Sequence, residues 1–391
     1  MKTKKLGLNT VCVHTGEVED LTFKGAISPI YLSTSYEFDE VDALRYPRNF
    51  NTPNQEALCA KIAALEHTEA ALLFGSGMAA LSAVFMAFLK SGDHLVVQNT
   101  LYGGAVNFIR QEFPKFGIEY TFTEGYEVDD FAAAIKPNTK LIHIETPSNP
   151  LLTITDIQGV ANLAKSRGIL TVIDNTFASP VNQNPIDFGI DIVMHSATKY
   201  MGGHSDILAG ALAASHQYID IIKNSAKNFG GNLSDFTVWM LERSMKTMGI
   251  RVKTQNRNAK KMAKWLSNQE LVTQVNYPGL KSHPQYELAK TQMKGSGGML
   301  SFELKPEVDP LKFMHALKYI KPVGSLAGVE STILLPAKTS HALLTPEQRA
   351  TMGVSDRLIR FSVGIESKDD LMYDISQALE KALLNVELQK Q

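Results

Sequence analysis

Two polar segments each follow a short apolar run, and their side chains together have the chemistry to hold a charged ligand. Asp174 ends one such run, and Ser196, Thr198 and Lys199 follow the run at residues 192–194. A carboxylate at the end of a buried strand is costly unless it meets a cation, and a protonated pyridine nitrogen is one such partner. A lysine amine beside hydroxyl groups can form a Schiff base while the hydroxyls bind a phosphate. Each residue taken alone also fits a surface salt bridge.

A glycine-containing segment at residues 75–78 lies between an expected strand and an expected helix. Helix N-termini bind phosphate, and small residues let a ligand approach the backbone. Extended to Ala80, the segment also matches the loose dinucleotide fingerprint, which requires an acidic residue at the end of the next strand. That strand ends in Gln98 and Asn99 instead, so a single phosphate fits better, while a plain tight turn remains an alternative. The candidate phosphate ligands of this segment are Ser76, Gly77 and Met78.

Two further side chains have suitable chemistry. Tyr102 follows an expected strand, where it can stack on a cofactor ring or transfer protons. Arg360 can hold a substrate carboxylate with two parallel hydrogen bonds, although by itself the polar face of an alternating strand explains this arginine better. The chain order of phosphate loop, Asp174 and Lys199 favours one shared site over separate salt bridges.

Other catalytic arrangements are missing from the sequence. The ten histidines show no metal-ligand spacing, so no metal is expected. There is no Gly-x-Ser-x-Gly elbow, and neither Cys12 nor Cys59 lies in a recognisable nucleophile context.

The elements that must position these residues alternate along the chain. Apolar runs separated by helical patterns predict a mostly parallel sheet with helices on both faces, which binds ligands at the carboxyl ends of its strands. A window at residues 70–89 lacks charges for twenty positions, which is long enough to span a bilayer. Its central glycines favour a strand, a turn and a helix instead. The predicted strands are residues 71–74, 95–98, 140–144, 170–173 and 191–194, and the predicted helices are residues 78–89, 105–113 and 157–166.

The pattern divides the chain into three parts: an arm at residues 1–49, a cofactor domain at 50–243 and a smaller α+β domain at 244–391. The cofactor domain opens with a helix signalled by Thr52 as N-cap, Pro53 at the first position and Gln55 completing a capping box. In the last part we predict strands at residues 300–304 and 358–363. A final helix begins near Ser367 and carries Leu371, Ile375, Leu379 and Leu383.

The bulk composition excludes several classes of partner. The 391 residues have a formal net charge of −1 and are 44% hydrophobic, so neither nucleic acid nor an anionic membrane is attracted electrostatically. Two cysteines are too few for a disulfide framework, and no apolar signal core follows the basic N-terminus. We therefore expect a cytoplasmic enzyme whose partners are a small molecule and other copies of the same chain.

The sequence resembles the Cys/Met-metabolism family of pyridoxal-phosphate (PLP) enzymes, which includes cystathionine γ-synthase, cystathionine γ- and β-lyases, methionine γ-lyase and homoserine sulfhydrylases. The resemblance runs from about Thr10 to the final helix. It implies the aspartate-aminotransferase-like fold (PLP fold type I) and a tetramer of two dimers that share active sites. The motifs that carry it are residues 46–48, 75–80, 145–150, 172–177, 195–200, 325–330 and 358–362.

The resemblance also implies roles for individual residues. Lys199 would carry the cofactor as a Schiff base, Asp174 would pair with the pyridine nitrogen, and Tyr102 would stack on the ring and transfer protons. The phosphate would be bound by Gly77, Met78, Ser196 and Thr198, with Tyr46 and Arg48 reaching the phosphate of the neighbouring subunit. Asn149, Ser325 and Arg360 would position the cofactor oxygen and the substrate carboxylate.

Departures from the family pattern bear on the substrate. Enzymes of the family that act on cystathionine usually have an acidic residue where this chain has Gly324, and an arginine near Asn107. Both departures favour γ-elimination from a short substrate such as methionine or homocysteine. Methionine γ-lyases, however, commonly have cysteine where this chain has Gly104, and the segment at residues 51–53 is one residue longer than usual.

Several alternatives therefore stay open. Within the family these are cystathionine γ-synthase, cystathionine γ-lyase and O-acyl-homoserine sulfhydrylase. A nicotinamide-dependent oxidoreductase and a non-catalytic scaffold are the alternatives from other classes. The missing ribose acid opposes the first, and the set of Tyr102, Asp174, Lys199 and Arg360 opposes the second.

Overall fold

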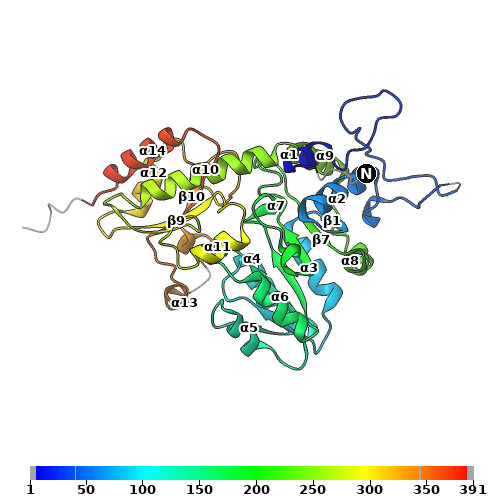
Figure 1. Ribbon diagram of the computed structural model, residues 1–391, viewed down its shortest axis with the longest axis horizontal. Helices are drawn as coiled ribbons and strands as arrows, with labels where there is room; N and C mark the ends of the chain where they lie inside the picture. Colours follow the sequence, from blue (N-terminus) through cyan, green and yellow to red (C-terminus); the bar gives the residue numbers. More distant parts are fainter. Residues whose placement is uncertain (1–5, 40, 341, 343–344, 385–391) are drawn as a thin grey trace, which may run out of the picture. The chain divides into compact units, whose positions relative to one another are not determined.

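The computed structural model describes residues 6–39, 41–340, 342 and 345–384 (Figure 1). The first five residues of the predicted arm therefore lie outside the described residues. The chain divides into two compact units, which are described separately. Unit 1 comprises residues 1–146 and 155–250, and unit 2 comprises residues 147–154 and 251–391. The division thus falls seven residues after the predicted one, and residues 147–154 leave the first unit for the second.

Unit 1 contains a seven-stranded sheet within the described residues, in the order β1-β7-β6-β5-β4-β2-β3. Strand β7 pairs antiparallel with both of its neighbours, whereas β6, β5, β4, β2 and β3 pair parallel with one another. This arrangement confirms the predicted mostly parallel sheet. The strands are β1 (Ala70–Phe74), β2 (His94–Val97), β3 (Glu119–Phe122), β4 (Thr139–Glu145), β5 (Leu170–Asp174), β6 (Ile192–His195) and β7 (Gly210–Ala214).

Helices cover this sheet, and one core cluster joins α3, α4 and α8 to alternate residues of its strands. The window suspected of spanning a membrane consists of strand β1, a turn and helix α3, and no helix of the described residues is long and apolar enough to span one. The helices of unit 1 are α1 (Leu8–His14), α2 (Pro53–Glu66), α3 (Gly77–Phe88), α4 (Gly103–Glu112), α5 (Val128–Ala134), α6 (Ile157–Ser166), α7 (Ser179–Asn182), α8 (His216–Phe229) and α9 (Asp235–Met245). The 3-10 turns are η1 (Pro47–Asn49), η2 (Phe113–Phe116) and η3 (Pro185–Phe188).

Helix α2 forms as its sequence predicts. The side chain of Thr52 accepts the backbone N–H of Gln55, the side chain of Gln55 accepts that of Thr52, and Pro53 is the first helical residue. Its buried face includes Leu58, Ile62 and Leu65. This helix ends at a residue of the candidate site described below.

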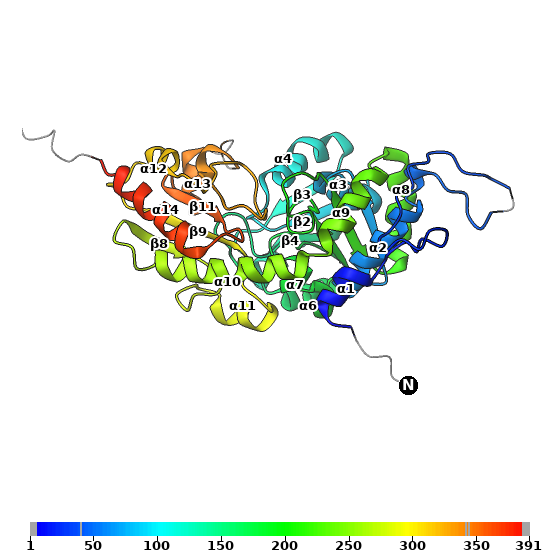
Figure 2. The same cartoon turned by 90° about the horizontal axis from the view of Figure 1, so that it is seen from above.

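Unit 2 contains a four-stranded antiparallel sheet in the order β10-β11-β9-β8. Helix α10 (Met248–Leu266) begins in unit 1 and continues in unit 2. Figure 2 shows α12 alongside α14, and many of their residues are neighbours. The remaining elements are β8 (Val272–Asn276), α11 (Tyr286–Gln292), β9 (Met299–Leu304), α12 (Pro310–Ala316), β10 (Thr332–Leu334), η4 (Pro336–Lys338), α13 (Pro346–Thr351), β11 (Leu358–Ser362) and α14 (Lys368–Lys381).

The last helix ends two residues before Leu383, the last residue that was assigned to it. Ser367 occupies the N-cap position of α14, and Leu371, Ile375 and Leu379 are buried as expected. The helix ends at Lys381, so the assignment of Leu383 to its apolar face was wrong. Leu383 instead forms a β-bridge with Val308 and is 42% exposed.

Candidate active site

Asp174 is the last residue of β5, at the carboxyl edge of the parallel sheet, where its neighbours in register are Glu145 and Met194. Its carboxylate accepts the backbone N–H of Thr176 at 2.9 Å and a hydrogen bond from the Thr176 hydroxyl. Burial raises the pKa of Asp174, while the Thr176 hydrogen bonds and the positive charge of His195 act in the opposite direction. Such a carboxylate gains from a cationic partner, so it fits the protonated nitrogen of a pyridine ring.

The N-terminus of α3 and the segment after β6 come into close contact through a glycine. Ser76 caps α3 by accepting the N–H of Ala79 at 3.0 Å. A Cβ atom on Gly77 would lie 2.9 Å from Cβ of Ser196, and one on Gly210 would lie 2.1 Å from the Ser76 carbonyl oxygen. Larger side chains at either glycine would separate these segments. Gly77 and Ser196, two of the predicted phosphate ligands, are therefore neighbours. The first N–H groups of a helix lack partners within the helix, so they can bind the same phosphate.

Lys199 and Thr198 lie in the turn that follows β6. The backbone N–H of Lys199 donates to the carbonyl oxygen of Ser196 at 3.1 Å. The Thr198 hydroxyl donates to the Ala209 carbonyl at 3.1 Å and accepts the Ala209 N–H at 3.0 Å. This hydroxyl is thus fixed by the backbone that enters β7, and its phosphate-binding role stays a prediction.

Tyr102 is the N-cap residue of α4, and its backbone N–H donates to Oε2 of Glu145 at 2.7 Å. The side chain is 49% exposed. A Cβ atom on Gly104 would lie only 2.4 Å from Cε1 of the tyrosine ring, so the glycine leaves the space that the ring occupies. Because Glu145 is in register with Asp174, the backbone of Tyr102 is anchored at the same sheet edge.

In unit 2 the three predicted substrate-binding residues meet. Arg360 lies in β11 and is 5% exposed. Its Nη1 donates to Oδ1 of Asn149 at 3.1 Å, and its Nη2 lies 3.5 Å from the carbonyl oxygen of Ser325. The Asn149–Pro150 peptide bond is cis. Ser325 makes this contact through its backbone carbonyl oxygen. The sequence predicted the residue but not the atom.

Tyr46 and Arg48 flank the start of η1 and are both exposed. The Arg48 guanidinium lies 5.7 Å from the centroid of the Tyr46 ring, and its Nη1 donates to the carbonyl oxygen of Lys227 in α8 at 2.8 Å. The predicted contact of both residues with a neighbouring subunit's phosphate stays a prediction.

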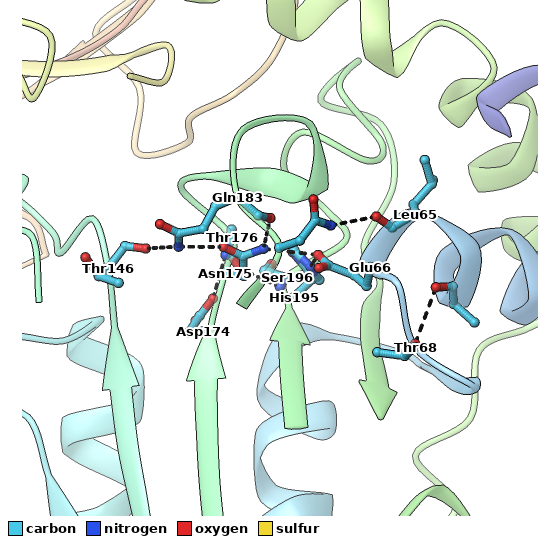
Figure 3. Close-up of polar contacts among 12 residues, drawn as sticks. Leu65, Glu66, Thr68, Thr146, Asp174, Asn175, Thr176, Gln183, His195 and Ser196 are labelled. Carbon is cyan, nitrogen blue, oxygen red and sulfur yellow. Dashed lines mark hydrogen bonds and ion pairs between the residues drawn. The ribbon is translucent and has the colours of Figure 1, made fainter. Parts of the chain in front are cut away.

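Sequence reasoning missed a buried polar network behind the sheet edge (Figure 3). Glu66, the last residue of α2, accepts a 2.5 Å hydrogen bond from Nε2 of His195 and a 3.1 Å bond from the Asn175 amide. Gln183 and Thr176 complete the network. One signal was present in the sequence: Glu66 lies four residues after Ile62, on the buried face of α2, where a charge needs a partner.

An acid and a lysine follow neighbouring parallel strands beside a glycine-lined helix N-terminus, and this combination is suited to a PLP-dependent enzyme. Residues 9–380 match the profile of the family described as Cys/Met metabolism PLP-dependent enzyme, and the chain belongs to this family. The protein is accordingly an enzyme that depends on pyridoxal phosphate.

Relatives of the chain include cystathionine γ-lyase of Bacillus subtilis, which is 42% identical over 95% of this chain and 98% of the relative. L-methionine γ-lyase of Fusobacterium nucleatum is 38% identical over 97% of this chain and 100% of the relative. Among solved structures, cystathionine γ-lyase from Lactobacillus plantarum complexed with L-serine is similar with a TM-score of 0.93 and 38% identity, covering 96% of this chain and 99% of the other. These similarities are consistent with PLP-dependent carbon–sulfur chemistry.

Proposed function

We propose that this enzyme cleaves the carbon–sulfur bond at the γ-carbon of a short amino acid such as methionine or homocysteine. The environment of Gly324 is the observation that supports a short substrate. This residue is exposed, and an added Cβ atom would meet nothing within 4 Å. The acidic side chain typical of family members that act on cystathionine is therefore missing here, although the space for it exists.

The proposed roles of the side chains follow from their chemistry. When bound, PLP supplies an electron sink for the charge that develops at the substrate Cα. Asp174 would keep the ring nitrogen protonated, which maintains this capacity. The Lys199 amine would take the Cα proton, which makes the Cβ hydrogen acidic in turn. Loss of that Cβ proton would supply the electrons of the Cβ–Cγ double bond as the Cγ–S bond breaks, and the Tyr102 hydroxyl would protonate the departing sulfur.

Arg360 would bind the substrate carboxylate, and the hydrogen bond from Arg360 to Asn149 supports this assignment because it fixes the guanidinium in advance. Loss of the thiol and hydrolysis of the remaining fragment would give 2-oxobutanoate and ammonia. In γ-replacement, a second thiol would add before release.

The second candidate substrate is cystathionine. Its support is the 42% identity to a cystathionine γ-lyase over 95% of the chain and the TM-score of 0.93 to another. Cystathionine γ-synthase and O-acyl-homoserine sulfhydrylase are further alternatives to this proposal, since they would use the same side chains with a thiol as acceptor.

We further propose a cytoplasmic homotetramer made of two active-site-sharing dimers. The support is a group of exposed apolar side chains in the arm, a feature typical of surfaces that bind another protein. Cys12 and Cys59 form no disulfide in the described residues, as is usual in a reducing compartment. Sedimentation analysis measures the oligomeric state directly. The most exposed of these apolar side chains are Leu21, Phe23, Phe38 and Leu44.

Product analysis on a substrate panel tests the function. Methionine, homocysteine, cysteine, cystathionine, and acetyl- and succinyl-homoserine would be supplied with and without sulfide or cysteine. Fast release of 2-oxobutanoate from methionine or homocysteine without added thiol is the expected result. Fast release from cystathionine alone would establish the second candidate. Consumption of an activated homoserine only after thiol addition would identify a biosynthetic enzyme and overturn the proposal.

A further inference from the structure

Glu66 is a fully buried carboxylate that the proposed chemistry does not use. Its Oε1 receives both the His195 and the Asn175 hydrogen bonds, at 2.5 and 3.1 Å, whereas its Oε2 has no partner in the described residues. Burying a carboxylate with one unpaired oxygen is costly, even when the other oxygen is well bonded. The position of this group therefore calls for a reason beyond the stability of the fold.

The two donors lie at the carboxyl ends of neighbouring strands. Asn175 directly follows Asp174 at the end of β5, and His195 ends β6, four residues before Lys199. One oxygen of Glu66 thus binds residues at the ends of two strands: β5, which ends in Asp174, and β6, which leads into the turn that contains Lys199 (Figure 3).

The surrounding hydrogen bonds reinforce this tie. The Asn175 amide exchanges two hydrogen bonds with Gln183, each 3.0 Å long. The N–H of Ser196 donates to the Thr176 hydroxyl at 2.8 Å, which links β6 to the residue that also binds the Asp174 carboxylate. Every bond of this set holds the end of β5 against another segment of unit 1.

Charge acts in the same direction. The positive charge of His195 lowers the pKa of Asp174, against the larger opposite effect of burial. His195 in turn pairs with the Glu66 carboxylate at 2.5 Å. Glu145, which is in register with Asp174, is a further titratable residue at this sheet edge.

We propose that Glu66 is a positioning residue of the cofactor site: through its hydrogen bonds with Asn175 and His195 it fixes Asp174 relative to Lys199. The inference rests on the proposed roles of Asp174 and Lys199. Glu66 touches neither substrate nor cofactor in this account, and it acts only through its two hydrogen-bond donors.

The chain offers a matched control. His67, the residue after Glu66, pairs with Asp187 at 2.9 Å, and both side chains are substantially exposed. Glu66→Gln and Asp187→Asn each replace a carboxylate that pairs with a histidine, but only the first pair contacts the ends of β5 and β6. Glu66→Asp retains the charge and shortens the side chain.

Each variant would be purified without cofactor, and its thermal unfolding, its affinity for added PLP and the visible circular dichroism of bound PLP would be measured. We expect Glu66→Gln to weaken PLP binding about tenfold or more and to reduce the visible dichroism. Glu66→Asp should give an intermediate loss, and Asp187→Asn should match the wild type.

Wild-type affinity and dichroism in Glu66→Gln would overturn the inference. So would failure of both Glu66 variants to fold, since Glu66 would then belong to the fold alone. Asp174→Asn, measured in parallel, separates the two proposals. If Asp174→Asn binds PLP as tightly as the wild type does, the proposed role of Asp174 fails. If Asp174→Asn weakens PLP binding and the Glu66 variants do not, only the positioning role of Glu66 fails.

Discussion

The residues proposed to bind the cofactor and those proposed to bind the substrate lie in two regions that are built differently. In unit 1, Asp174 lies at the end of a parallel strand, and burial raises its pKa. In unit 2, Arg360 lies inside an antiparallel strand and already donates to Asn149. Burial thus opposes the charge of Asp174, whereas a hydrogen bond already orients the guanidinium of Arg360. Variants of unit 1 should therefore alter cofactor binding, and variants of unit 2 should alter substrate binding.

Lys199→Ala should have the largest effect. Without an amine to hold PLP and to take the Cα proton, turnover should fall about a thousandfold or more. Steady-state assays of product release measure this loss. Lys115→Ala, which removes an exposed lysine paired with Glu112, should leave turnover unchanged. Normal turnover in Lys199→Ala would refute the assignment of the lysine.

Arg360→Lys tests the proposed role of unit 2 in substrate binding. A lysine cannot reproduce the planar two-donor geometry, so KM should rise about tenfold or more. The affinity for PLP and the visible dichroism should stay as in the wild type. A loss of PLP affinity with an unchanged KM would reverse the roles that we assign to the two regions.

Gly324→Glu should have a smaller effect, confined to substrate choice. The open space around Gly324 accommodates the new side chain without a clash. We expect cystathionine cleavage to gain about threefold relative to methionine, the size typical of one exposed charge interaction. Relative kcat/KM values for the two substrates measure it, with Gly324→Gln as the uncharged control. An equal gain in both variants would exclude charge recognition at this position.

Asp174→Asn in the cofactor-free protein should have the smallest effect, and it concerns stability. Because the folded-state pKa of Asp174 is raised, its contribution to stability is present at low pH and is lost as pH rises through that pKa. At pH 7 the variant should therefore unfold about 2 °C above the wild type, with the gap closing near pH 4. Thermal unfolding followed across this range tests the sign. A wild type that is more stable at pH 7 would contradict the account of a strained carboxylate.

Much of the fold was predictable because its signals are local. The helix at Ile157–Ser166 agrees with its prediction at both ends, and the Thr52 capping box formed as expected. Two strands of the larger sheet were missed. The edge strand Glu119–Phe122 is short and only partly buried, and Gly210–Ala214 consists of glycine, alanine and one leucine without the β-branched side chains that mark a strand.

Part of the candidate site could also be proposed from local signals. Asp174 and Lys199 stand out because each follows an apolar run that ends at the ligand-binding edge of the sheet. The pairing of Glu66 with His195 spans 129 positions of the chain, and nothing in either local sequence specifies it. Only the fold brings such residues together, so sequence patterns identify a charge that needs a partner without identifying the partner.

The most direct test of the central claim is to fix PLP to the protein with borohydride and to map the modified peptide by mass spectrometry. We expect a single modified residue, Lys199. We also expect less modification in Gly77→Ala, because the added Cβ atom would crowd Ser196. Modification of another lysine, or none in a protein that retains activity, would contradict the proposed site.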